Sequence, residues 1–330
     1  MRCEQLIDNF LDVGWLNYQW SKNTIKTYKN ELSSFRKWIR SSRGKKLLNA
    51  TFEDVTDFLE IKSTGRVCTH NLRISVLRHF YRHLFQKCKI GRNPCIGLKS
   101  VIRQHDLPSV LSESQVQILL EMPDISTSTG LRNKAILELL YATGIRVSEL
   151  TLLELSNLFL PNRYLIVRAH TSKSNCDRIV PFGAIAAHWL TRYLEEVRPS
   201  QSRMQHALRI AVNLVFLGRS TAGGLSNRTC YEIVAFHARR ASITQRVSPH
   251  TLRHSFATHL LNGGASLIVI QKLLGHKSAQ TTQIYTHRAI ARLHQVHARH
   301  HPRGELFSNQ DLKKGRHYHL MNQIEPVEKA

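Results

Sequence analysis

Apolar residues recur at the spacing of an α-helix through the first hundred positions of the chain. After Ser21, steps of three and four residues separate Ile25, Tyr28, Leu32, Phe35 and Ile39. This spacing places the five side chains on one face of a helix, and Ser21 is a suitable N-cap for it. Thr51 begins another helix-start signature, and a longer helical pattern runs from about 66 to 87. The first part of the chain is therefore expected to be entirely helical.

The helix expected over 66–87 has an apolar face and a basic face. The apolar face consists of Val67, Ile74, Leu77, Tyr81 and Leu84, and the basic face of Arg66, His70, Arg73, Arg78 and Arg82. A charged helix face is either simply solvated or in contact with phosphate groups. No carboxylate lies between these bases in the sequence, which favours phosphate contact.

The helical pattern breaks at Gly91-Arg92-Asn93-Pro94, because glycine and proline interrupt helices. The polar stretch that follows, as far as Pro108, is expected to be a linker. A chain of 330 residues is long enough for about two domains. We therefore predict an N-terminal helical domain over 1–91, a linker over 92–108, a second domain over 109–302 and a polar tail over 303–330.

The second domain is expected to be mostly helical with a small β-sheet. Two β-rich runs, at 164–167 and 178–180, flank a polar stretch and indicate a loose hairpin. Ser112 and Ser248 are the N-caps of two expected helices. The apolar patterns predict helices over 131–143, 184–197, 248–262, 267–274 and 279–287.

The charge balance indicates the kind of partner. The 47 lysines and arginines exceed the 23 aspartates and glutamates, which gives a formal net charge of +24. Residues 1–105 carry 20 basic and 8 acidic side chains, and residues 106–330 carry 27 and 15. Such a chain favours a polyanion, and two basic domains can bind a nucleic acid duplex from two sides.

Membrane, secreted and metal-binding classes are disfavoured. No apolar run approaches the roughly 18 residues of a membrane-spanning helix, and the N-terminus lacks a secretory signal. The six cysteines are scattered, so reduced thiols in the cytoplasm are expected rather than a zinc site or disulfides. His294, His297, His300 and His301 have helical spacing without accompanying cysteine or carboxylate, which favours a helix that contacts DNA or a neighbouring subunit over a metal site.

Six residues of the second domain form a pattern that is suited to phosphoryl transfer. In chain order they are Arg146, Lys173, His250, Arg253, His276 and Tyr285. Arginine presents a planar fork of donors to phosphate oxygens, and fixed cationic donors stabilise the charge that builds there. A tyrosine can act as nucleophile, and a lysine can protonate the leaving oxygen. Each of these residue types alone more often has a structural role. The prediction therefore depends on the occurrence of all six in this order.

The sequence resembles the tyrosine recombinases, the phage-integrase-like family, and within it the bacterial Xer recombinases of the XerC and XerD type. The resemblance is carried by ATGIRVSEL at 142–150, SPHTLRHSFATHLL at 248–261, LLGH at 273–276 and TTQIYTH at 281–287. It implies an N-terminal helical core-binding domain, which is SAM-like, and a mixed, mainly helical catalytic domain. Together the two are expected to close on DNA as a C-shaped clamp.

The resemblance also implies roles for the residues of the pattern. Tyr285 corresponds to the nucleophile that forms a 3′-phosphotyrosine bond with one DNA strand. Arg146 and Arg253 correspond to the pair that binds the scissile phosphate. His250 corresponds to an acid/base histidine, and His276 to a second histidine that hydrogen-bonds the phosphate. The phosphotyrosine conserves the bond energy, so neither ATP nor a metal is implied as a cofactor.

Lys173 corresponds to the hairpin lysine that protonates the departing 5′-oxygen in this family. In Xer-like proteins that lysine usually lies between glycines, whereas Ser172 and Ser174 flank it here. Serines suit a turn but are less free than glycine at positive φ. Lys173 therefore departs from the family pattern in the residues that flank it.

The implied activity is site-specific recombination of double-stranded DNA. The partner would be the chain itself or a paralogous recombinase in a tetrameric synaptic complex, located on the nucleoid in the cytoplasm. The implied purpose is the resolution of chromosome or plasmid dimers. A mobile-element integrase with the same chemistry stays open as an alternative. A DNA-binding protein without catalysis is disfavoured by the six competent residues, and a type IB topoisomerase by the helical first domain.

Overall fold

The computed structural model describes residues 3–62, 67–101, 110–171, 176–207, 213–218, 224–275 and 287–304. The chain divides into two compact units, residues 1–105 and residues 106–330. Within the described ranges, no helix combines the length and the apolar character that crossing a membrane requires.

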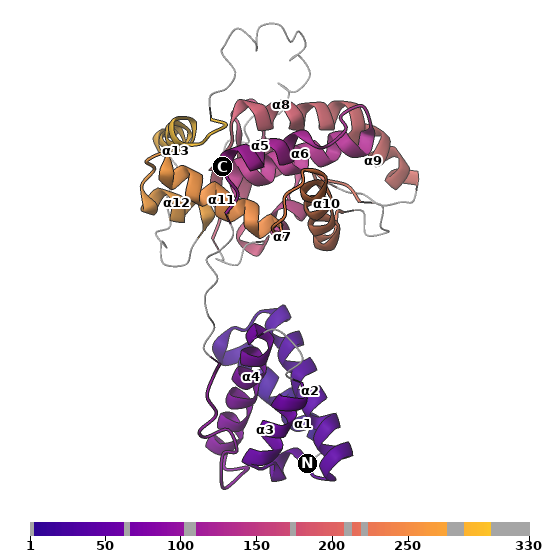
Figure 1. Ribbon diagram of the computed structural model, residues 1–330, viewed down its shortest axis with the longest axis vertical. Helices are drawn as coiled ribbons and strands as arrows, with labels where there is room; N and C mark the ends of the chain where they lie inside the picture. Colours follow the sequence, from indigo (N-terminus) through magenta and orange to yellow (C-terminus); the bar gives the residue numbers. More distant parts are fainter. Residues whose placement is uncertain are drawn as a thin grey trace, which may run out of the picture. The chain divides into compact units, whose positions relative to one another are not determined.

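The first unit is built from helices, as the sequence predicts (Figure 1). They are α1 (Cys3–Tyr18), α2 (Lys22–Arg43), the 3₁₀ turn η1 (Leu47–Asn49), α3 (Phe52–Ile61) and α4 (Val67–Gln86). Ser21 caps α2 by accepting a hydrogen bond from the Thr24 N–H at 3.2 Å. Thr51 and Asp54 form a capping box at the start of α3. These helices enclose a core of their own, which includes Leu32, Phe35, Phe58 and Phe80.

Helix α4 confirms its expected apolar face only in part, and two arginines of its basic face bond to other groups of the same unit. Ile74, Leu77, Tyr81 and Leu84 are buried, but Val67 is 40% exposed because it is the first residue of the helix. Arg73 forms an ion pair with Glu31 of α2 at 3.1 Å, and Arg78 donates to the Leu98 carbonyl. Two of the expected phosphate contacts are therefore occupied within the unit.

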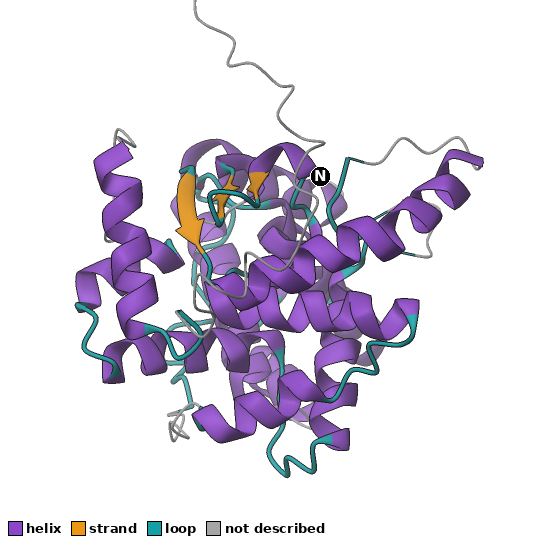
Figure 2. Cartoon of the chain, turned by 90° about the horizontal axis from the view of Figure 1, so that it is seen from above, coloured by secondary structure: helices purple, strands orange, loops and turns teal. Residues whose placement is uncertain are grey.

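The second unit is mostly helical and contains a small sheet (Figure 2). Its helices are α5 (Glu113–Glu121), α6 (Ser128–Thr143), α7 (Val147–Thr151), α8 (Ala184–Arg192), α9 (Arg198–Ala207), α10 (Asn227–Arg240), α11 (Pro249–Asn262), α12 (Leu267–Leu274) and α13 (His287–His300). Short 3₁₀ turns, η2 (Leu155–Asn157) and η3 (Ala169–Thr171), flank the first two strands. The predicted bounds of α11 and α12 are confirmed, whereas 279–286 lie outside the described residues.

The sheet has three antiparallel strands in the order β1 (Leu158–Phe159), β2 (Tyr164–Val167) and β3 (Arg178–Pro181). In the β2–β3 pair, Leu165 lies opposite Val180, and both side chains are buried. The predicted hairpin is thus confirmed, and its strands continue the core of the surrounding helices.

Helix α6 lies at the centre of the second unit and packs against α8 and α11. Its side chains from Leu131 to Thr143 are almost all buried, as is usual for a helix that is covered on every side. Gly144 ends the helix with a φ of 58°, and a Cβ there would lie 2.4 Å from the Phe256 ring. Glycine is therefore needed for both the backbone conformation and the close approach of α11.

The helix predicted over 184–197 continues to Ala207, so the predicted end is wrong. The stretch Tyr193–Val197, labelled η4, is wound as a π-helix and joins α8 to α9. A proline clashes with the carbonyl four residues before it in a regular α-helix, and the wider π-turn just before Pro199 reduces that clash.

The segment that enters the second unit is bound to α11 through both backbone groups of Leu111. The Leu111 N–H donates to Ser255 Oγ at 3.0 Å, and the Leu111 carbonyl accepts from His259 Nε2 at 2.9 Å. The other ring nitrogen of His259 accepts from the Tyr141 hydroxyl of α6 at 2.8 Å. The start of this unit is thereby tied to the helix that carries His250 and Arg253.

Helix α13 is packed into the second unit by histidine side chains. His297 Nε2 donates to the Ala142 carbonyl at 2.7 Å, and the His297 and His301 rings stack with centroids 4.6 Å apart. Both side chains are buried, so the interpretation of these two as contacts to DNA or a neighbouring subunit is wrong. Beyond the helix, Arg303 binds Glu138 of α6 at 2.9 Å, and 305–330 lie outside the described residues.

Candidate active site

Arg146 follows the end of α6 and is the N-cap residue of α7. Its Nη1 donates to Glu149 Oε1 at 2.8 Å, and its backbone N–H donates to Glu149 Oε2, also at 2.8 Å. Its Nη2 donates to the Gly275 carbonyl at 3.3 Å. The side chain remains 20% exposed.

Arg253 lies at the start of the second turn of α11, a helix that begins with Ser248 as N-cap and Pro249 at the first position. The Arg253 side chain is buried, and its Nη1 and Nη2 donate to the carbonyls of Gly144 and Leu274, each at 2.6 Å. A single guanidinium therefore joins the carboxyl ends of α6 and α12.

The carboxyl end of α12 is where the arginines meet. Three consecutive carbonyls accept from three different arginines: Leu273 from Arg178, Leu274 from Arg253 and Gly275 from Arg146. The last carbonyls of a helix lack partners within it and carry partial negative charge. The end of α12 thus gathers guanidinium groups that are far apart in the sequence.

The cluster has an excess of positive charge. Within the described part of the chain, Glu149 is the carboxylate that pairs with these arginines, through Arg146 and Arg178. Burial opposes the ionisation of Glu149, but the hydrogen bonds and charges of Arg178 and Arg146 outweigh it and hold the pKa below its ordinary value. Burial, reinforced by the charge of Arg146, lowers the pKa of Arg253 to about 9. An added anion would relieve this repulsion.

Of the six residues of the sequence pattern, three are described. Arg146 and Arg253 bond to neighbouring carbonyls, and His250 is an exposed residue in the first turn of α11, three positions before Arg253. Lys173, His276 and Tyr285 lie outside the described residues, and their places are fixed only along the chain. Lys173 falls between β2 and β3, His276 directly follows Gly275, and Tyr285 comes two residues before α13.

The sequence pattern missed Glu149 and Arg178. Glu149 stands three residues after Arg146, where a helix-start carboxylate commonly binds the N-cap backbone, so a capping-box search would have found it. Arg178 carries no comparable local signal, because its partners lie 29 and 95 residues away in the sequence.

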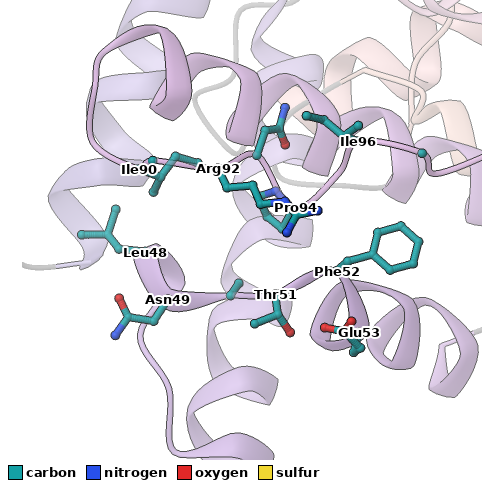
Figure 3. Close-up of a pocket in the computed structure, with 13 residues that line it drawn as sticks. Leu48, Asn49, Thr51, Phe52, Glu53, Ile90, Arg92, Pro94 and Ile96 are labelled. Carbon is teal, nitrogen blue, oxygen red and sulfur yellow. The ribbon is translucent and has the colours of Figure 1, made fainter.

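The first unit contains a separate hollow of about 630 Å³. Figure 3 shows the segment from Leu48 to Glu53 facing the segment from Ile90 to Ile96 across it. None of the six residues of the sequence pattern lines this hollow, so it is not part of the arginine cluster.

Comparison with known proteins places both units in one family. The model of the "Phage integrase family" matches residues 109–292, and that of the "Phage integrase, N-terminal SAM-like domain" matches residues 7–87. "Tyrosine recombinase XerD" of Ralstonia nicotianae is 37% identical over 301 residues, which cover 91% of this chain and 95% of the relative. "Tyrosine recombinase XerD" of Shewanella oneidensis is 40% identical over 307 residues, which cover 92% and 98%. The chain is a tyrosine recombinase of the phage integrase family.

The fold of this tyrosine recombinase is also found among solved structures. Lambda integrase bound to DNA has a TM-score of 0.64 and 16% identity, and the match covers 93% of this chain and 98% of the other. The arginine cluster falls within the residues matched by the phage integrase model. The family breaks and rejoins DNA strands at specific sites, and this recombinase is Xer-like within it.

Proposed function

We propose that the chain is an Xer-like site-specific recombinase that cuts and rejoins double-stranded DNA through a 3′-phosphotyrosine intermediate at Tyr285. The main support is the meeting of two arginines. Arg146 and Arg253 come from different helices and bond to the adjacent carbonyls of Gly275 and Leu274, immediately before His276.

The proposed chemistry assigns a task to each residue of the pattern. The Tyr285 oxygen attacks the scissile phosphorus and displaces the 5′-oxygen of the DNA strand, and Lys173 protonates that oxygen as it leaves. Arg146 and Arg253 stabilise the charge on the non-bridging oxygens, with a hydrogen bond from His276. His250 acts as acid/base. In this scheme the phosphotyrosine bond stores the energy for rejoining, so no cofactor takes part.

Electrostatics supports phosphate as the missing partner of the cluster. Three arginines gather there with one carboxylate, which pairs with two of them, and repulsion between Arg146 and Arg253 contributes to the lowered pKa of Arg253. A phosphodiester brings one negative charge and two oxygens that accept from planar guanidinium groups. Binding would therefore stabilise the charged form of Arg253.

The proposed partners are duplex DNA and further recombinase subunits. A net charge of +24 favours a polyanion, and lambda integrase, which has the same fold, is seen bound to DNA. The proposed assembly is a tetramer with itself or a paralogous recombinase, acting at the nucleoid in the cytoplasm. The proposed purpose is the resolution of chromosome or plasmid dimers. A mobile-element integrase would share this chemistry but act on the ends of its element.

Covalent capture of DNA tests the proposal. The chain is incubated with duplexes that carry candidate chromosomal sites, and SDS-resistant adducts are separated by electrophoresis. Wild type should form an adduct, and Tyr285→Phe should bind the same DNA but form none, because only the nucleophilic oxygen is removed. An adduct in Tyr285→Phe would exclude this tyrosine as the nucleophile, and binding without any adduct in wild type would favour a DNA-binding protein without catalysis.

A further inference from the structure

Arg178 is the first residue of β3 and its guanidinium is held by protein acceptors at all three nitrogens. Nε donates to the Leu273 carbonyl at 2.9 Å. Nη1 and Nη2 donate to Glu149 Oε1 and Oε2 at 3.0 and 2.6 Å. The side chain is buried, so these bonds are protected from solvent. Arg178 thereby links the strand that follows the Lys173 hairpin to two other segments of the site.

The first link runs to Arg146. Glu149 is fully buried, and each of its oxygens accepts from both arginines: Oε1 from Arg146 Nη1 and Arg178 Nη1, and Oε2 from the Arg146 N–H and Arg178 Nη2. Arg178 therefore fixes the carboxylate that fixes both the backbone and the side chain of Arg146. Planar bidentate pairing is specific to arginine, since a lysine cannot bind both oxygens in this way.

The second link runs to the end of α12. Besides binding the Leu273 carbonyl, the Arg178 guanidinium lies directly beside Gly275, where a Cβ would come within 3.1 Å of Nη1. Gly275 has a φ of 67°, a left-handed conformation that favours glycine, and it precedes His276. The residue that ends α12 is thus packed directly against the Arg178 guanidinium.

We propose that Arg178 is a positioning residue of the recombination reaction, which sets Arg146 through Glu149 and sets the carboxyl end of α12 through Leu273 and Gly275. The inference rests on the proposed function. Arg178 is not assigned a phosphate contact, because its side chain is buried and each of its three nitrogens donates to a protein oxygen. A shift of about 1 Å in a group that binds the transition state can cost on the order of 100-fold in rate.

The competing explanation is that Arg178 only stabilises the fold. Replacement of a buried ion pair by apolar side chains is often tolerated, so loss of stability alone does not identify a positioning role. The test therefore measures the rate of adduct formation at saturating DNA, together with the affinity for DNA and the free energy of unfolding. Arg198→Met is the matched control, because Arg198 also donates to a carbonyl, that of Leu214, outside the cluster.

We expect Arg178→Met to bind DNA as tightly as wild type but to form the adduct roughly 100-fold more slowly. Arg178→Lys should be intermediate, since it restores the charge without the bidentate geometry, and it replaces the Met variant if that variant does not fold. Arg198→Met should keep the wild-type rate at equal folded concentration. Equal rates for wild type and Arg178→Met would overturn the positioning role.

A double-mutant cycle with Glu149 gives a readout that a purely structural role would not move. If Arg178 acts through Glu149, the rate of adduct formation should fall by a similar factor in Glu149→Gln and in the double variant Glu149→Gln/Arg178→Met. The rate losses of the two single variants should not multiply in the double variant. Arg178 also helps to keep Glu149 ionised. Arg178→Met should therefore lose rate as the pH falls through a range in which wild type does not, and the double variant should lack that dependence. Multiplicative losses and an unmoved pH profile would contradict the inference.

Failure of the inference is distinguishable from failure of the proposed function. If wild type forms no adduct with any duplex that it binds, the recombinase chemistry fails before the Arg178 variants are compared. If wild type forms the adduct and Arg178→Met matches it, the chemistry stands and only the positioning role is lost.

Discussion

Arg146 and Arg253 differ in how much of each guanidinium is bound inside the protein. Arg253 is buried and bonds two helix-end carbonyls at 2.6 Å, whereas Arg146 is 20% exposed and bonds one carbonyl at 3.3 Å. Removal of either donor should slow cleavage about 100- to 1,000-fold. Arg253→Ala should in addition lower the free energy of unfolding by about 1–3 kcal/mol, because a buried acceptor loses its partner.

Urea unfolding and adduct formation, measured on the same preparations, separate the two effects. Arg146→Ala should lose cleavage with a smaller loss of stability, because Glu149 Oε1 keeps its bond from Arg178 Nη1, and Arg253→Ala should lose both. Wild-type cleavage by Arg146→Ala would make that arginine a surface residue, and equal destabilisation of both variants would contradict the difference in burial.

The role of Lys173 can be tested by changing the leaving atom of the DNA substrate. If it protonates the departing 5′-oxygen, Lys173→Ala should cleave ordinary DNA roughly 100- to 10,000-fold more slowly. A 5′-bridging sulfur leaves without a proton, so the variant should cleave that substrate nearly as fast as wild type. A lysine that only steadied the phosphate would matter with either atom, and failure of the sulfur substrate to restore the rate would assign the proton to another group.

Sequence alone could single out Arg146, His250 and Arg253 as candidates because each stands in a recognisable local motif. It could not identify the partners of these residues. Arg178 meets Glu149 and Leu273 only after β3, α7 and α12 have packed together, and no local spacing encodes that meeting. The arginines were predictable, and the carbonyls and carboxylate that hold them were not.

At the scale of elements, α13 makes the stability of the second unit sensitive to acid. Burial lowers the pKa of His297 to about 4 and lowers that of His301 well below its ordinary value. Below about pH 6.5 these histidines bind protons in the unfolded chain but not in the folded chain. Their contribution to the free energy of unfolding is therefore fully present above pH 6.5, and the stability falls as the pH drops toward 4. His297 contributes about 1.4 kcal/mol per pH unit in that window, and His301 acts in the same direction.

Urea unfolding of the DNA-free protein between pH 7 and pH 5 checks this dependence. His297→Gln removes one titrating group while an amide can still donate to the Ala142 carbonyl, so its stability should fall by about 1.4 kcal/mol less per pH unit than that of wild type. An unchanged slope would mean that His297 is protonated in the folded state.

Helix starts were predicted well and other features less so, for a physical reason. Ser21, Ser112 and Ser248 cap their helices through bonds to residues three positions away, and such bonds are visible in the sequence. The end of α9 depends on a π-turn before Pro199. The basic face of α4 depends on Glu31, which lies on another helix. Those outcomes are set by tertiary packing, which periodicity does not report.

At the scale of the whole molecule, both units should contribute to the affinity for DNA. Each has its own core and an excess of basic side chains. The logarithm of the binding constant should therefore fall with the logarithm of salt concentration more steeply for the whole chain than for residues 106–330 alone. Titrations from about 50 to 200 mM salt measure both slopes. Equal slopes would mean that residues 1–105 release no counterions from DNA.

The contacts that build the arginine cluster also determine the stage of protein synthesis at which it can form. They join residues that are 95, 109 and 129 positions apart, from Arg178 to Leu273, from Arg253 to Gly144 and from Arg146 to Gly275. Two of these pairs need the carbonyls at the end of α12. A ribosome adds those residues only after more than four-fifths of the chain has been synthesised. A chain still being synthesised has its DNA-attracting charge long before it has an ordered cluster. A nascent or prematurely ended product can therefore occupy DNA without being able to cut it.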